Sequence, residues 1–227
     1  MDENDFHHQI KEFVHGHGAV NNKFLSRFSR GDSTEQEFTR GAVEFFHFSR
    51  EWPAILATLL VNTPDEEEAA ELTKILVSEL GNDNPSQRHE LLFRDFLRSM
   101  NIDPKQAMRH KPLETTSRFV NGLKKLFSST DHTIALGAEF GLETMAIPMW
   151  DKLIPGLKIR KNTTRPELDI TFFTFHRKLE EGHEDAADHL LKIHVTSREE
   201  QRKFLTGVTT VLDLLEQFWL GMSDYEV

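Results

Sequence analysis

The stretch FHRKLEEGH, residues 175–183, places two histidines and a glutamate where one face of a helix would carry all three. His176, Glu180 and His183 stand at positions i, i+4 and i+7, and a helix advances about 100° per residue, so they fall within about 60° of one another. Apolar residues share that face by the same arithmetic: Phe172, Phe173, Leu179, Ala187 and Leu190.

Ionisable residues in the middle of an apolar stripe are unusual, because a surface helix keeps them on the opposite side. Ordinary core histidines beside a glutamate that reaches the surface are the alternative. That alternative suits a single histidine better than a triplet on a phenylalanine-rich face. The triplet therefore favours metal ligands.

Composition narrows the classes of protein. The 227 residues carry a net charge of −10 without a block of Lys or Arg, so the basic surface that binds nucleic acid or anionic membranes is missing. The chain has no cysteine, which excludes disulfides, thiolate metal sites and a cysteine nucleophile. No apolar run approaches the roughly 20 residues of a membrane span. The acidic start MDENDFHHQ does not resemble a signal peptide. We expect a cytoplasmic protein with no nucleic-acid or membrane partner.

The hydrophobic pattern is helical throughout, since apolar residues recur at three- and four-residue steps and no stretch alternates with period two. No linker, low-complexity tract or repeat divides the chain, which predicts one domain over residues 1–227. The pattern predicts helices at 4–16, 34–60, 64–80, 86–100, 114–127, 132–154, 166–192 and 197–221.

Start signals support three of these helices. Thr63 precedes a proline and a capping-box glutamate, Ser197 with Glu200 repeats the capping box, and Pro166 is expected to open the helix of the triplet.

Three further ionisable residues fall within apolar stripes. Glu79 shares a helix face with Leu72, Ile75 and Leu76, and His89 shares one with Phe93, Phe96 and Met100. Glu143 lies on the same face as Leu136, Phe140, Ile147 and Trp150. An unpaired buried ion costs several kcal/mol, and these stripes contain no Lys or Arg. Bound metal is the simplest source of positive charge.

The predicted ligand set is Glu79, His89, Glu143, His176, Glu180 and His183. Three carboxylates and three imidazoles without sulfur suit two iron or manganese ions better than structural zinc. Ferritin-like helix bundles use Glu-x-x-His twice, whereas this chain has it once, at 180–183, which argues against that fold.

In this order the ligand motifs resemble the haem-oxygenase-like diiron oxidases and oxygenases, above all the branch with the chlamydial protein associated with death domains. Three segments carry the resemblance: FSRGDSTEQEFTRGAVEFFHFSREWP (28–53), SELGNDNPSQRHELLFRDFLRSMNID (78–103) and ALGAEFGLETMAIPMW (135–150). It implies an all-α, haem-oxygenase-like bundle of about seven to eight helices. It further implies two Fe ions, with Mn as an alternative, O2 as co-substrate, no haem, a small-molecule substrate and a homodimer.

The chain departs from this branch in several places. Gly81 and Pro85 break the helix between Glu79 and His89. Position 180 is Glu where the chlamydial protein has Asp. That protein also sacrifices a tyrosine whose place is taken here by Leu25, and the only tyrosine of this chain is Tyr225. We therefore do not expect self-sacrifice by that route. Lys152 lies close to a lysine that the same protein uses, although a solvated helix lysine is the simpler interpretation.

Other functions of the fold remain alternatives. A thiaminase of this fold depends on a cysteine and is excluded. A cofactor-free oxidase of the pyrroloquinoline quinone synthase type would not require the carboxylates. A haem oxygenase needs an axial histidine, and His15 and His17 lie in a glycine-rich HGHG segment that is more typical of a helix end. A non-catalytic metal-binding or interaction protein of the same fold is the alternative outside enzymology.

A dry cavity beside the metals would need apolar walls. Six residues are predicted to provide them, with ordinary core packing as the alternative for each: Phe45, Phe46, Phe48, Phe140, Met145 and Trp150. His47, within the same phenylalanine-rich segment, either lines this cavity or packs in the core.

Overall fold

The computed structural model describes residues 3–223, apart from the side chains of residues 3–5 and 180–186. This part of the chain is all-α and contains no strand, as predicted. It forms eleven α-helices and one short 3-10 helix, so the expectation of seven to eight helices was too low. The elements are α1 (Glu3–Gly16), α2 (Lys23–Ser29), α3 (Glu35–Ser49), α4 (Trp52–Asn62), α5 (Glu66–Glu79), η1 (Pro85–Gln87), α6 (His89–Ser99), α7 (Pro104–Arg109), α8 (Glu114–Phe127), α9 (His132–Thr163), α10 (Thr171–His194) and α11 (Arg198–Leu220).

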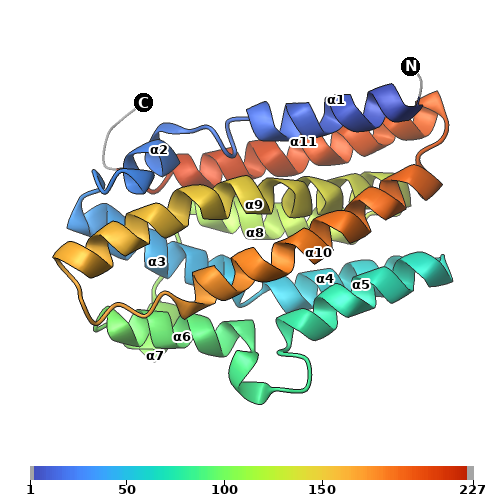
Figure 1. Ribbon diagram of the computed structural model, residues 1–227. Helices are drawn as coiled ribbons and strands as arrows, with labels where there is room; N and C mark the ends of the chain where they lie inside the picture. The colour runs from blue at the N-terminus through green and yellow to red at the C-terminus, as the bar shows by residue number, and fades with distance from the viewer. Residues whose placement is uncertain (1–2, 224–227) are drawn as a thin grey trace.

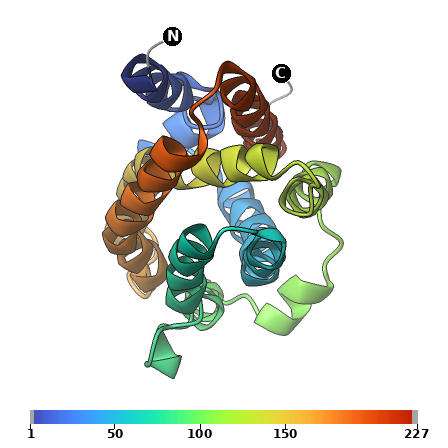
Figure 2. The same cartoon turned by 90° about the vertical axis from the view of Figure 1, so that its right-hand side faces the viewer.

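The longest helix, α9, organises the bundle. It packs against α10, α11, α2 and α8, and α1 and α11 lie side by side along one edge of the molecule (Figure 1). Helices α4, α5 and α6 lie on the other side of α9 and α10, as the view along the bundle shows (Figure 2). The candidate ligands belong to α5, α6, α9 and α10, which meet in the middle of the bundle.

Helices α9 and α11 touch through their backbones. A Cβ atom on Gly137 would lie 2.1 Å from the carbonyl oxygen of Phe204, and one on Gly207 would lie 2.0 Å from that of Ile134. Only residues without a side chain fit such a contact. This pair of glycines fixes α9 against α11 and thereby sets which face of α9 turns toward α10.

Prolines explain where the predicted boundaries fail. The stretch 34–60 forms two helices instead of one, because Pro53 has no N–H to continue the hydrogen-bond ladder at the start of α4. The stretch 132–154 continues through Pro155 to Thr163, because the burial of Gly156, Leu157 and Arg160 compensates for the lost hydrogen bond.

Two of the three start signals were misplaced. The residue that caps α5 is Asp65 rather than Thr63, and its carboxylate accepts from the N–H of Glu68 at 2.9 Å. Helix α10 begins at Thr171 and not at Pro166, and in the non-helical connection before it the Lys161 ammonium donates to the carbonyl of Leu168. The capping box of Ser197 and Glu200 is confirmed.

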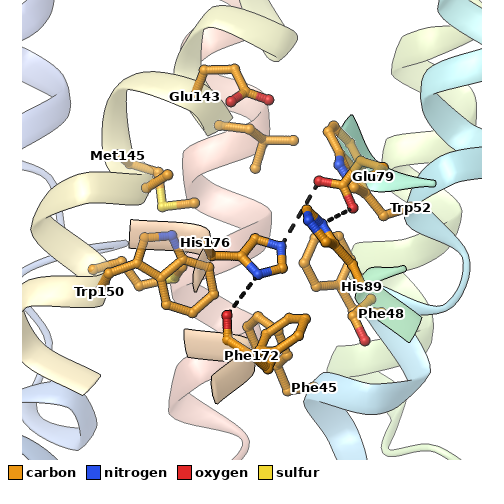
Figure 3. Close-up of a pocket in the computed structure, with 14 residues that line it drawn as sticks. Phe45, Phe48, Trp52, Glu79, His89, Glu143, Met145, Trp150, Phe172 and His176 are labelled. Atoms are coloured by element: carbon orange, nitrogen blue, oxygen red, sulfur yellow. Dashed lines mark hydrogen bonds and ion pairs between the residues drawn. The ribbon is translucent and has the colours of Figure 1, made fainter. Parts of the chain in front are cut away.

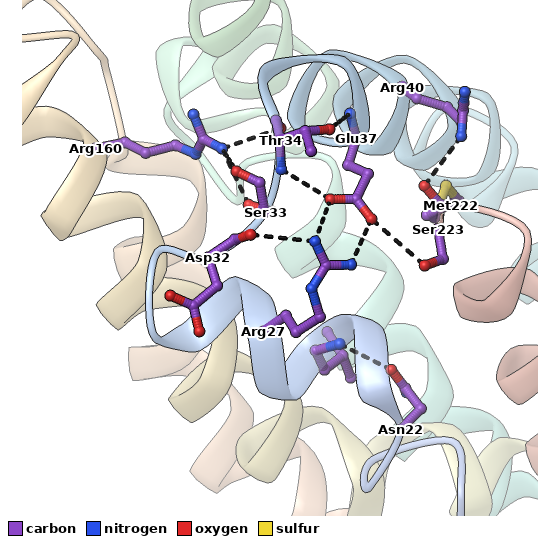
Figure 4. A network of polar contacts seen from close by, with 11 residues as sticks. Asn22, Arg27, Asp32, Ser33, Thr34, Glu37, Arg40, Arg160, Met222 and Ser223 are labelled. Atoms are coloured by element: carbon purple, nitrogen blue, oxygen red, sulfur yellow. Dashed lines mark hydrogen bonds and ion pairs between the residues drawn. The ribbon is translucent and has the colours of Figure 1, made fainter. Parts of the chain in front are cut away.

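A polar network anchors the start of α3 (Figure 4). The Arg27 guanidinium donates to both carboxylate oxygens of buried Glu37, at 2.7 and 2.9 Å. Arg160 of α9 donates to Ser33 and Glu35, and its guanidinium lies 4.3 Å from the centroid of the Phe38 ring. With its start tied to α2 and α9, α3 presents its later residues to the middle of the bundle.

Among the described residues, no helix combines the length and the apolar character that crossing a membrane requires.

Candidate metal centre

Four of the predicted ligands line one cavity of about 60 Å³ in the middle of the bundle (Figure 3). Glu79 comes from the end of α5, His89 from the start of α6, Glu143 from α9 and His176 from α10. All four are buried, with 4–7 % of their surface exposed. The structure therefore brings four of the six predicted ligands, from four separate helices, to one cavity.

Three of these residues lie close enough to share one ion. Glu79, His89 and His176 each offer a ligand atom, and these atoms lie within 4.8 Å of one another. The Nδ1 atom of His89 lies 2.6 Å from Oε2 of Glu79, and Nε2 of His176 lies 3.9 Å from Oε1 of the same carboxylate. Glu79 is thus placed between two imidazoles.

The ring of His176 is oriented for coordination. Its Nδ1 lies 2.9 Å from the carbonyl oxygen of Phe172, one turn earlier in α10. A carbonyl only accepts hydrogen bonds, so Nδ1 carries the proton and the lone pair is on Nε2, the atom that faces Glu79. A backbone carbonyl that fixes the tautomer is the usual support of a metal-bound histidine.

The turn between α5 and α6 brings Glu79 and His89 together. Gly81 and Asn82 have positive φ angles of 91° and 49°, and a Cβ on Gly81 would lie 2.6 Å from the carbonyl oxygen of Asn84. The chain reverses here, so that the last residue of one helix faces the first residue of the next. The predicted break between these two ligands is confirmed.

Glu143 reaches the same cavity from α9, away from the Glu79–His89 pair (Figure 3). The backbone of Glu180 and His183 belongs to α10, as the spacing predicts. Their side chains, like Tyr225, lie outside the described residues, so their place in the ligand set stays a prediction.

The apolar wall is partly as predicted. Phe45, Phe48, Met145 and Trp150 line the cavity. Phe46 and Phe140 do not, because they point into the core elsewhere. Phe46 stacks on Phe93, and Phe140 packs against Phe204 of α11.

Sequence reasoning missed six residues that complete the lining: Ser49, Trp52, Leu142, Ala146, Met149 and Phe172. Phe172 and Ala146 could have been found, since each lies about one turn from a ligand on the same helix. Trp52 could not, because it reaches the cavity only where the chain turns from α3 into α4.

Lys152 is partly buried and has two hydrogen-bond partners, so it is not simply a solvated lysine. Its ammonium donates to the carbonyl oxygen of Val20 at 2.7 Å and to Oδ1 of Asn21 at 2.8 Å. Burial lowers its pKa. Lys152 fastens the link between α1 and α2 and does not line the cavity, and Leu25 is fully buried in the core.

A second group of potential ligands does not suit a metal. His17, Asp213 and Glu216 lie near one another, and Nε2 of His17 is 3.3 Å from Asp213. However, Nδ1 of His17 accepts the N–H of Ala19 at 3.1 Å, so in the neutral ring the proton resides on Nε2, which then donates to Asp213. The ring has no lone pair left for a metal. By contrast, the donors around Glu79 fit iron, since they are buried nitrogen and oxygen atoms and His176 is held in the tautomer that leaves Nε2 unprotonated.

Known proteins share this sequence and fold. The chain is 28% identical to 4-chloro-allylglycine synthase from Streptantibioticus cattleyicolor over 223 residues, which cover 95% of this chain and 84% of the relative. A CADD-like protein from Nostoc punctiforme has the same fold with a TM-score of 0.80 and 16% identity, covering 98% of this chain and 97% of the other. A domain with a haem-oxygenase-like fold from Shewanella denitrificans gives a TM-score of 0.75 and 17% identity, covering 98% and 92%.

A family model described as iron-containing redox enzyme matches residues 40–216. That range contains all four helices that carry the candidate ligands. The chain therefore belongs to this family of iron-containing redox enzymes.

Proposed function

We propose that this protein is a non-haem diiron oxidase or oxygenase that uses O2 to oxidise a small organic metabolite. The observation that carries the proposal is the buried group of Glu79, His89 and His176, which faces Glu143 across an apolar cavity. Membership in a family of iron-containing redox enzymes supports the choice of iron.

In this proposal Glu79, His89 and His176 hold one ion. Glu143 completes the site together with Glu180 and His183, which remain predicted ligands. Two iron ions, when bound, would supply the electrons that O2 reduction requires. The protein contributes orientation and a dry environment.

The surrounding residues have separate tasks. The carbonyl of Phe172 keeps the proton of His176 on Nδ1. The Nδ1 atom of His89 lies 2.6 Å from Oε2 of Glu79, and a proton held between them would have to leave if these two atoms were to hold the same ion, since ligands must be deprotonated. The rings of Phe45, Phe48 and Trp52 give the cavity apolar walls that disfavour water (Figure 3). Water exclusion strengthens every electrostatic interaction within the site.

Amino acids are the substrate class to test first. The synthase that is 28% identical to this chain is named for a product that is a chlorinated amino acid. A cavity of about 60 Å³ admits only part of such a molecule, so we expect the substrate to place its reacting carbon in the cavity and its polar end outside it.

Oxygen consumption tests the proposal. Protein loaded with Fe(II) under anaerobic conditions is mixed with oxygenated buffer that contains either an amino-acid panel or a metabolite extract. We expect substrate-dependent oxygen uptake that requires iron, with a new product by mass spectrometry. Equal uptake without iron would favour a cofactor-free oxidase. Iron binding without substrate-dependent uptake would favour a non-catalytic metal-binding protein.

A further inference from the structure

A second cavity, of about 30 Å³, lies among aromatic rings next to the cavity of the metal centre. Seven of its twelve lining residues are phenylalanines, and the others are Gly41, Ala42, Leu153, Leu157 and Trp219. The indole N–H of Trp219 is therefore the only side-chain group of the lining that can form a hydrogen bond. Since a buried water needs about two to four polar partners, this cavity disfavours water.

The two cavities lie end to end along α3. Gly41, Ala42 and Phe45 line the second cavity, and Phe45, Phe48 and Ser49 line that of the metal centre. Helices α6, α9 and α10 also contribute to both cavities. The residues that line the second cavity are Phe93 and Phe96 on α6, Leu153 and Leu157 on α9, and Phe173 on α10, and those that line the metal centre include His89 on α6, Trp150 on α9, and Phe172 and His176 on α10.

Three rings form the wall between the cavities. Phe45 is the only residue that lines both. Its ring stacks on that of Phe93 with the centroids 5.6 Å apart, and it lies 6.2 Å from that of Phe172. The rings of Phe93 and Phe172 meet edge to face at 4.7 Å. Phe45 and Phe172 lie at the end of the metal centre remote from Glu143 (Figure 3). Buried side chains change rotamer without a change of fold, so these rings can let a small molecule pass.

The second cavity also approaches the surface. Gly41 is partly exposed, whereas the other eleven lining residues are buried. Gly41, Phe45 and Ser49 follow one another at steps of four residues and therefore lie on one side of α3. A path along this side leads from the surface at Gly41, through the second cavity and past Phe45, to the metal centre.

The size of the cavity decides which apolar molecule fits. About 10–15 Å³ holds one water-sized sphere, so 30 Å³ has room for a molecule of two heavy atoms but not for an alkyl chain. O2 has two atoms and no charge, and an apolar molecule moves favourably from water into apolar surroundings.

We propose that this cavity is a binding site for O2 on its way from the surface to the candidate metal centre. The inference rests on the proposed function, in which O2 is the co-substrate. It assigns Gly41 to the entrance of the path and Phe45 to the wall that O2 passes.

Xenon is the probe, because this apolar gas binds in dry protein cavities. Crystals of the full-length, iron-loaded protein are pressurised with xenon under anaerobic conditions, and its anomalous scattering locates it. We expect a xenon peak between Phe45, Phe96 and Leu153. A missing peak in a protein that consumes O2 would overturn the cavity assignment alone, whereas a peak in a protein that consumes no O2 would contradict the proposed function.

Two buried alanines provide a variant and its matched control. Ala42 lines the second cavity, whereas Ala107 of α7 lines neither of the two. Ala42→Val adds two methyl groups to the cavity. We expect it to abolish the xenon peak and to lower the second-order rate constant of O2 uptake severalfold, with Fe(II) affinity unchanged. Ala107→Val should keep both the peak and the rate. An Ala42→Val protein that lacks the peak but takes up O2 at the parental rate would overturn the proposal.

Discussion

Burial alone does not distinguish a ligand carboxylate at the scale of single residues. Glu37, Glu44 and Glu68 are as buried as Glu79. Glu37 is paired with Arg27, Glu44 accepts the N–H of Leu113 at 3.0 Å and Glu68 lies 2.7 Å from His132 at the protein surface. Glu79 differs because its neighbours are two buried imidazoles rather than a fixed cation.

The first prediction concerns iron affinity. His176→Ala removes a ligand and should weaken Fe(II) binding by at least about tenfold, because even the loss of a supporting contact to a metal ligand costs 10–100-fold. The measurement is anaerobic equilibrium dialysis with iron analysis, which should approach two ions per chain in the parent. His189→Ala, in the same helix but exposed, is the control. Equal affinity of the two variants would remove His176 from the site.

The second prediction concerns pH. Burial lowers the pKa of His47 below its ordinary value of 6.5, although Glu44 partly opposes this. The unfolded chain therefore takes up a proton near pH 6.5 while the folded protein does not, so this residue costs stability as the pH falls below 6.5. In His47→Gln that loss is absent.

Urea unfolding between pH 8 and pH 5 measures the effect. The free energy of unfolding of the parent should fall relative to that of His47→Gln as the pH decreases through about 6.5. His8→Gln, at an exposed position of α1, is the control and should track the parent. A constant difference between parent and His47→Gln would show that His47 titrates alike in both states.

At the scale of elements, two ligands depend on a turn. The segment between α5 and α6 contains two positive φ angles and a single 3-10 turn. Few apolar contacts hold it, since residues 82–86 are exposed. Such segments lie at the low end of local stability in a protein.

The third prediction follows from this turn. Iron binding should slow hydrogen exchange over residues 80–88, because Glu79 and His89 become fixed at its two ends and metal binding is coupled to ordering. Hydrogen-exchange mass spectrometry of apo and Fe(II)-loaded protein measures it. Helix α8, which carries no predicted ligand, is the internal reference. Identical exchange of residues 80–88 in both forms would contradict the assignment of these ligands.

The fourth prediction concerns the contact of α9 with α11. Gly207→Ala should lower the free energy of unfolding by about 1–3 kcal/mol, the usual cost of overpacking, since its Cβ would lie 2.0 Å from a backbone oxygen. Gly16→Ala is the control, because its Cβ would meet no atom within 4 Å. Urea denaturation of both variants gives the comparison. A Gly207→Ala protein as stable as the parent would mean that the helices can separate at little cost.

At the scale of the whole molecule, four helices from three separate parts of the sequence each bring a predicted ligand to the candidate metal centre. An ion bound by these residues would link α5, α6, α9 and α10. A ligand that binds only the folded state stabilises it by mass action.

The fifth prediction is a stability change on metal removal. Free Fe(II) at 100 times its dissociation constant should stabilise the fold by about 2.7 kcal/mol, which raises the unfolding temperature by about 5–10 °C for a chain of this size. Calorimetry under anaerobic conditions measures the shift, and a chelator should reverse it. His176→Ala should show a smaller shift at the same iron concentration. A parent protein indifferent to iron would contradict the proposed centre.

The sequence by itself determined the class of fold, the triplet spacing on α10 and the break between Glu79 and His89. These depend on local properties: the helical period, the backbone preferences of glycine and proline, and the chemistry of side chains. For the same reason the capping box at Ser197 was readable from the sequence.

Only the tertiary structure decided which buried residues meet. It turned Phe46 and Phe140 away from the cavity and Trp52 toward it, gave Lys152 two partners in the link between α1 and α2, and carried α9 through Pro155. The face that a residue shares is a property of its own helix, whereas its neighbours across the bundle depend on how helices pack. That packing is fixed by contacts such as Gly137 with Phe204, between residues far apart in the chain, which no local pattern contains.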